Sequence, residues 1–217
     1  TGTAIYLLSL PQTPSIIAGV ICGICVVVML PGFMIIQPNN SRVLTFFGRY
    51  AGTVISNGFY WVNPLFLKST VTLRILNLNI DPIKVNDKVG NPIMIGAVVV
   101  WRIKDTYKAS FDISGNIREF VQIQSDAALR QVAGMYAYDT NETIDKVTLR
   151  SDESGEITQR LEDELNSRLA IAGIEIVEAR INYLAYASEI ASVMLRRQQA
   201  DAIISARERI VEGAVSM

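Results

Sequence analysis

The sequence predicts an α+β protein in which an N-terminal transmembrane helix precedes a strand-rich piece, a helix-strand piece and a long C-terminal helix. Three features support this order. No charged side chain occurs before Arg42, alternating apolar residues dominate from there to Ile103, and apolar residues at helical spacing dominate from Asn116, interrupted by one further strand. We therefore expect five segments, with the bounds 1–15, 16–37, 38–104, 105–186 and 187–217.

The composition argues against most catalytic and nucleic-acid-binding classes of protein. The 217 residues carry a formal net charge of -1, whereas a nucleic-acid binder needs a basic surface to neutralise phosphates. The chain has 0 histidines, and both of its 2 cysteines lie within the apolar run 16–36, so the usual zinc ligands and the usual general base are missing. We therefore expect no cofactor, no metal and no enzyme, although Ser-Lys and paired-carboxylate mechanisms stay open.

The apolar run 16–36 is long enough to cross a bilayer, because a helix rises about 1.5 Å per residue and the run extends roughly 30 Å. Pro31 and Gly32 lie near its end, so a re-entrant hairpin is the alternative to a single span. We interpret Cys22 and Cys25 as packing residues rather than a redox pair. Basic residues follow the run and none precedes it, which predicts a cytoplasmic body.

The most aromatic stretch of the chain, residues 59–68, follows shortly after this run. Trp and Tyr favour the headgroup level of a membrane, so one interpretation is a surface that dips into the bilayer. Burial in a protein core is the other interpretation. On the first interpretation, the membrane-contacting residues are Phe59, Tyr60, Trp61, Leu65, Phe66 and Leu67.

Strand patterns fill the first half of the body. We predict a hairpin whose turn has Gly48 at one end and Gly52 at the other. The alternation changes face once between residues 71 and 80, which predicts one long strand with a bulge near Ile75. The continuous apolar run 93–103 predicts a central strand that is covered on both faces.

Helical patterns follow. Asp105 is expected to cap a short helix, and Asn116 to begin a longer one that runs to about Met135. A further helix should end at Gly173, and the strand 174–183 then returns the chain to the sheet. The acidic residues of the helix that ends at Gly173 are expected to face solvent, a metal site being the alternative. The inner face of the helix after Asn116 is predicted to comprise Ile117, Phe120, Ile123, Ala127, Ala128, Val132 and Met135; that of the next helix, Ile157, Leu161, Leu165 and Leu169.

The last helix should start at Ser188 and continue beyond Met217. Its apolar residues form two adjacent stripes and its charges balance along its length, which is typical of a helix packed between two neighbours. The predicted oligomer interface consists of Ile190, Val193, Arg197, Ala200, Ile203, Ile204, Arg207, Ile210 and Val211.

Several segments, in this order, resemble the SPFH/band 7 family, which includes stomatins, prohibitins, flotillins and HflK/HflC. The similarity is closest to its bacterial single-span branch. The segments that carry it are PNNSRVLTFFGRYAGTV (38–54), GFYWVNP (58–64), KVNDKVGNPIMIGAVVVWRI (84–103), QSDAALR (124–130) and EARINYLAYASEIASVMLRRQQADAIISARERIVEGAV (178–215).

The resemblance implies that 38–104 is an SPFH1 subdomain, that 105–186 is SPFH2, and that 187–217 begins a coiled-coil wall. It further implies a non-enzymatic scaffold, a homo-oligomer of many subunits that forms a ring or cage on membrane lipids. Such a scaffold organises a microdomain and holds membrane-protein clients such as proteases, here with its body on the cytoplasmic side of a bacterial inner membrane. No nucleic acid is expected as a partner.

Two other functions remain open. One is a membrane-tethered hydrolase using Ser-Lys or paired-carboxylate chemistry, whose candidate residues are Lys84, Asp87 and Lys88 on one polar turn. A monomeric lipid-binding module would instead contact the bilayer through Trp61 and Phe66.

Overall fold

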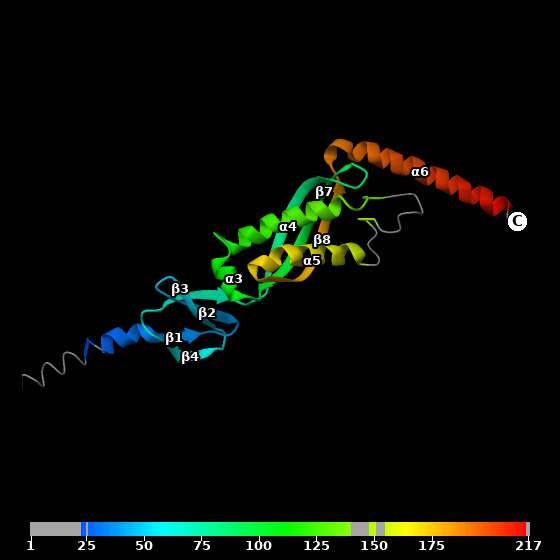
Figure 1. Cartoon of the computed structure of the whole chain (residues 1–217). Helices are drawn as coiled ribbons and strands as arrows, with labels where there is room; N and C mark the ends of the chain where they lie inside the picture. Colours follow the sequence, from blue (N-terminus) through cyan, green and yellow to red (C-terminus); the bar gives the residue numbers. More distant parts are fainter. Residues whose placement is uncertain (1–22, 25, 140–147, 151–154, 216–217) are drawn as a thin grey trace, which may run out of the picture. The chain divides into compact units, whose positions relative to one another are not determined.

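The computed structural model describes residues 23–24, 26–139, 148–150 and 155–215, so the predicted flank 1–15 lies outside it. The chain divides into two compact units, Thr1–Arg74 and Ile75–Met217. Figure 1 labels their helices and strands. Each unit is described by itself below.

The first unit consists of short antiparallel strands around a small apolar core. They form a two-stranded sheet of order β1-β4 and a three-stranded sheet of order β3-β2-β5. Met34, Ile36 and Leu44 make the core, and Tyr60 and Phe66 pack against it partly buried. The strands are β1 (Phe33–Ile36), β2 (Asn40–Phe46), β3 (Arg49–Val54), β4 (Gly58–Trp61) and β5 (Leu67–Thr72).

The predicted membrane helix does not extend to residue 36. Residues 23, 24 and 26–29 are helical, η1 (Leu30–Gly32) follows, and β1 begins at Phe33. Pro31 lacks a backbone donor, and residues 33–36 alternate between exposed and buried side chains and pair with β4. The helix prediction is therefore wrong for 33–36, where strand pairing overrides the apolar run.

Within the described residues, no helix is both long and apolar enough to cross a membrane. Residues 16–22 and 25 of the predicted span, with both cysteines, lie outside that part of the chain.

The hairpin of β2 and β3 is present, but its turn is tighter than predicted. Phe47 and Gly48 have φ of 48° and 79°, as a two-residue turn of type I′ requires. Residues 49–52, expected as part of the turn, belong to β3. The pairing of β3 with β2 shifts register between Leu44 and Thr45.

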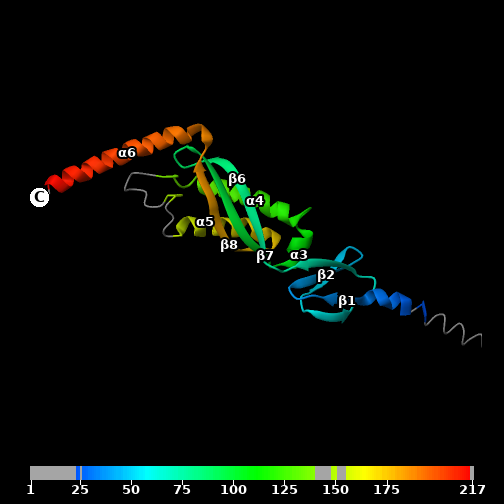
Figure 2. The ribbon, with the colours of Figure 1, turned by 180° about the vertical axis from the view of Figure 1, so that it is seen from behind.

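The second unit packs helices on an antiparallel sheet of order β6-β7-β8. Figures 1 and 2 view it from opposite sides, and in both views α4 and α5 lie against one face of the sheet. β6 and β7 come from the segment 38–104, but β6 pairs with β7 and β7 pairs with β8, so the boundary between the units falls inside that segment. The elements are β6 (Leu76–Asn86), β7 (Pro92–Ile103), α3 (Thr106–Phe111), α4 (Ile117–Ala133), α5 (Glu156–Leu169), η2 (Ala170–Ala172), β8 (Ile174–Tyr186) and α6 (Ser188–Val215).

β7 is the central strand, as predicted, but helices cover only one of its faces among the described residues. Ile93 and Ile95 are fully buried, whereas Met94, Val98 and Val100 on the opposite face stay half-exposed. The prediction that both faces are covered is therefore wrong for this part of the chain.

The predicted long strand with a bulge near Ile75 is also wrong. β5 ends at Thr72 and β6 begins at Leu76, so the change of face marks the junction between the two units. A register shift does occur further along, between Ile80 and Ile83 of β6.

The helix starts are confirmed. The side chain of Asp105 accepts hydrogen bonds from two backbone N–H groups at the start of α3, and Asn116 accepts one from Arg118 at the start of α4. α5 buries the predicted four leucine and isoleucine residues, and Gly173 follows η2 in a left-handed conformation.

The predicted inner face of α4 is rotated relative to the observed one. Ile123 and Met135 are exposed, and Asp126 is partly buried, which raises the pKa of its carboxyl group. Two neighbouring stripes of α4 are apolar, and periodicity alone does not choose between them. The residues that α4 buries are Val121, Ser125, Ala128, Leu129, Val132 and Ala133.

Candidate functional site

The two strands β1 and β4 form a ribbon with one apolar face inward and one apolar face outward. Phe33 is the partner of Trp61 and Ile35 of Phe59, and Met34 between them turns into the core. Alternation along each strand therefore places the side chains of Phe33, Ile35, Phe59 and Trp61 together on the outer face. We call these four residues the apolar ribbon.

The apolar ribbon is solvent-accessible in the described structure. Phe59 is 67% exposed and Trp61 is 49% exposed, and the rings of Phe33 and Phe59 stack with centroids 5.3 Å apart. Scattered single apolar residues are normal on a protein surface, but a contiguous aromatic group is typical of a contact surface.

The six predicted membrane-contact residues separate into two groups. Phe59, Trp61, Leu65 and Leu67 are exposed, whereas Tyr60 and Phe66 pack against the core of the first unit. Sequence reasoning missed the other two members of the apolar ribbon because it assigned residues 33 and 35 to a helix. Their alternation with Met34 and Ile36 was the available signal.

The end of the helical segment is fastened to the strands of the first unit by backbone carbonyls. Trp61 Nε1 donates to Met29 O at 3.2 Å, and Lys68 Nζ donates to Pro31 O. Val62 N donates to Gly32 O at 2.9 Å. A Cβ on Gly32 would lie 2.6 Å from Val62 O, so only glycine allows this close approach.

The predicted interface residues of α6 are exposed in the single chain from Val193 onward, and Ile190 is half-buried. The first turns of α6 are attached to the rest of the second unit by an ion pair between Lys84 and Glu189 and by Gln198 Nε2, which donates to Asp139 Oδ2 at 3.2 Å. The rest of the helix extends away from these contacts (Figure 1).

The polar turn that motivated the hydrolase alternative is a structural turn. Asp87 is buried, and its carboxylate accepts hydrogen bonds from the backbone N–H groups of Val89, Asn91 and Tyr138 at 3.0, 2.7 and 3.1 Å. Lys84 is paired with Glu189 instead. The two side chains are thus engaged with different partners, and the structure does not bring them together.

The acidic face of α5 is engaged in pairwise contacts. Glu162 accepts a hydrogen bond from Ala179 N, and Glu164 pairs with Arg168. Among the residues that the structure describes, no three potential ligands come close enough to hold a metal ion.

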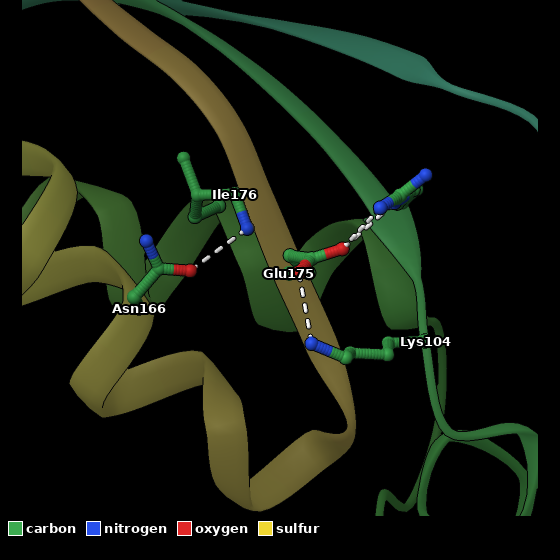
Figure 3. A network of polar contacts seen from close by, with 5 residues as sticks. Lys104, Asn166, Glu175 and Ile176 are labelled. Carbon is green, nitrogen blue, oxygen red and sulfur yellow. Dashed lines mark hydrogen bonds and ion pairs between the residues drawn. The ribbon is translucent and has the colours of Figure 1, made fainter.

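Figure 3 shows a second polar network, at the start of β8. Glu175 accepts from Lys104 Nζ at 2.9 Å and from Arg102 Nε at 2.8 Å. The hydrogen bond from Lys104, followed by that from Arg102, lowers the pKa of the Glu175 carboxyl group. Beside it, Asn166 Oδ1 accepts from Ile176 N at 2.9 Å and holds α5 to the strand.

A lowered pKa in the folded state means that Glu175 stabilises the fold at neutral pH and loses this effect as pH falls below the ordinary carboxyl range, about 4.3. We expect Glu175→Gln to unfold at lower urea than the parent at neutral pH. The difference should be small, because the cations are half-exposed or more, and it should shrink towards pH 3. Glu208→Gln, at an exposed position of α6, is the control. A difference that persists unchanged in acid would contradict the assignment.

A comparison with family models matches residues 34–214 to the one described as SPFH domain / Band 7 family. The match begins in β1 and ends in α6, so it includes strands and helices of both units. A search of curated proteins found no match.

Proposed function

Since the chain belongs to the SPFH domain / Band 7 family, a family of membrane-associated scaffolds rather than enzymes, we propose that it is a membrane-anchored scaffold. In this proposal many copies assemble into a ring or cage on the cytoplasmic side of a bacterial inner membrane. The assembly organises a microdomain and holds membrane-protein clients such as proteases.

The observation that carries this proposal is the exposure of α6. A helix of 28 residues is stable in water mainly when an apolar face is covered, and here Ile203, Ile210 and Val211 are more than half exposed. Other copies of the same helix would cover them.

A closed ring requires each copy to present two different faces. At about 100° per residue, the nine predicted interface residues occupy slightly less than half of the circumference of α6. Leu195, Ala202 and Ala206 lie on the opposite side and provide a second, aliphatic face, with small side chains at Ala202 and Ala206. This arrangement suits a helix placed between two neighbours.

The apolar ribbon supports the membrane part of the proposal. Aromatic and aliphatic side chains at this density favour the interfacial region of a bilayer. We propose that these residues, with Leu65 and Leu67, rest on the membrane.

Ile203→Asp should weaken assembly at least about tenfold, because the interface would then bury an unpaired carboxylate. Mass photometry and electron microscopy of the detergent-extracted chain measure this. Ser205→Asp adds the same charge between these two faces of α6, about 60° around the helix from both Ile190 and Ala202, and should leave the particle unchanged. A parent protein that stays monomeric at micromolar concentration would refute the scaffold and favour the monomeric lipid-binding module.

A further inference from the structure

The first unit contains basic side chains but no acidic ones. Residues 1–80 contain Arg42, Arg49, Lys68 and Arg74 but no Asp or Glu, so all 21 acidic residues lie later in the chain. The net charge of -1 therefore conceals a basic first unit followed by an acidic remainder. A basic unit that also exposes an apolar ribbon has the two properties that attract proteins to anionic membranes.

Two of the basic residues lie on one face of the three-stranded sheet. Arg42 of β2 is paired with Thr70 of β5, and the neighbouring pair along the same face joins Leu44 to Lys68. Arg42 and Lys68 are thus diagonal neighbours, close enough for long side chains to reach a common ligand.

Arg42, Lys68 and Thr70 line an open pocket with a volume of about 710 Å³, within the range of small-molecule sites. The pocket runs along β1, and its apolar wall includes Phe33, Ile35 and Phe59. Basic side chains and the apolar ribbon therefore border the same cavity.

The polar groups of this pocket suit a phosphate. Among the residues that the structure describes, no carboxylate lines the pocket and no ion pair involves Arg42. Lys68 donates to Pro31 O, which uses one of the three ammonium hydrogens. A guanidinium group matches two phosphate oxygens at once, and an ammonium group adds a second positive charge.

We propose that this pocket binds the phosphate headgroup of an anionic phospholipid, whose acyl chains lie along the apolar ribbon. The proposal rests on the proposed membrane contact of the ribbon and adds the class of lipid. A zwitterionic phospholipid carries its own compensating ammonium group and has no net charge to attract. The pocket should therefore select phosphatidylglycerol over phosphatidylcholine.

Trp61 provides a local probe. It is paired with Phe33, which lines the pocket, and the other tryptophan, Trp101, is 3% exposed in the second unit. The full chain carrying Trp101→Phe is reconstituted into mixed vesicles in which either the phosphatidylglycerol or the phosphatidylcholine has brominated acyl chains. Bromine quenches tryptophan on contact, so the ratio of the two quenching efficiencies, corrected for lipid content, reports which lipid surrounds Trp61.

We expect this corrected ratio, phosphatidylglycerol over phosphatidylcholine, to be at least about two. Each basic side chain at an anionic surface favours binding roughly fivefold. Arg42→Gln with Lys68→Gln should return the ratio to one. Arg42→Gln alone, which breaks no contact with Pro31, should reduce it. Arg49→Gln with Arg74→Gln removes the same charge elsewhere and should leave the ratio unchanged.

The outcomes separate the two proposals. A ratio of one in the parent chain, with clear quenching by both lipids, overturns the anionic-lipid site and leaves the membrane contact intact. No quenching by either lipid refutes the contact of the ribbon itself. A ratio that falls equally in the Arg49 and Arg74 variant shows unspecific attraction and overturns the pocket as its source.

Discussion

Replacing Phe59 by aspartate is expected to lift the apolar ribbon off the bilayer. Phe59 is largely exposed and stacks on Phe33, so the substitution removes apolar contact worth roughly 1.5–3 kcal/mol and places a charge at the interface. The population of the membrane-bound ribbon should therefore fall at least about tenfold. In vesicles that contain the Trp101→Phe chain, quenching of Trp61 by dissolved acrylamide should rise towards its value in detergent-free unfolded protein.

The control for this experiment is Ile171→Asp, because Ile171 is 73% exposed in the second unit and offers the same change from an apolar side chain to a carboxylate. Its acrylamide quenching should equal that of the parent. If Phe59→Asp also behaves like the parent while Trp61 stays shielded, another surface makes the membrane contact. Near-ultraviolet circular dichroism of both variants checks that the fold is retained.

Replacing Gly173 by alanine is expected to cost the second unit about 3 kcal/mol of unfolding free energy. Gly173 has a φ of 67°, and a Cβ there would lie 2.6 Å from Asp105 O. Its own carbonyl accepts hydrogen bonds from Lys104 N and Asp105 N, both at 2.9 Å, so the backbone cannot move away without losing them. Left-handed strain of roughly 1–2 kcal/mol adds to the steric overlap.

Gly134→Ala is the matched control in the same unit. Gly134 has a φ of -71°, and an added Cβ would lie 3.6 Å from its nearest neighbours, the carbonyl oxygens of Arg130 and Gln131, so the free energy of unfolding should change by less than about 1 kcal/mol. Urea denaturation followed by circular dichroism measures both variants. Equal stability of the two would show that the junction of η2, β8 and α3 can relax around a side chain.

Local sequence patterns were sufficient to predict much of the second unit. The leucines of α5 recur at intervals of four residues and lie on one stripe whatever they pack against, and Gly173 is the conventional end of such a helix. The strand β8 could also be predicted from its own residues, because apolar and polar side chains alternate along it. The local pattern did not determine which face of α4 is buried, because two adjacent stripes are apolar and only packing on the sheet selects one of them.

Only half of the candidate site could be predicted from such local patterns. Aromatic content indicated Phe59 and Trp61, but Phe33 and Ile35 join them through pairing with a strand more than twenty residues later, which a continuous apolar run conceals. Arg42 and Lys68 likewise share a pocket because β2 pairs with β5. Non-local pairing of strands is the information that the pattern of single residues does not contain.

The absence of carboxylates from the first 80 residues also affects how the first unit responds to acid. The whole chain lacks histidine, so this stretch has no side chain that gains or loses a proton between roughly pH 4 and pH 8. Its positive charge is constant across that range. Acidification that protonates other proteins would leave this surface unaltered, and any change in its attraction to a bilayer would originate in the lipids or in the salt concentration.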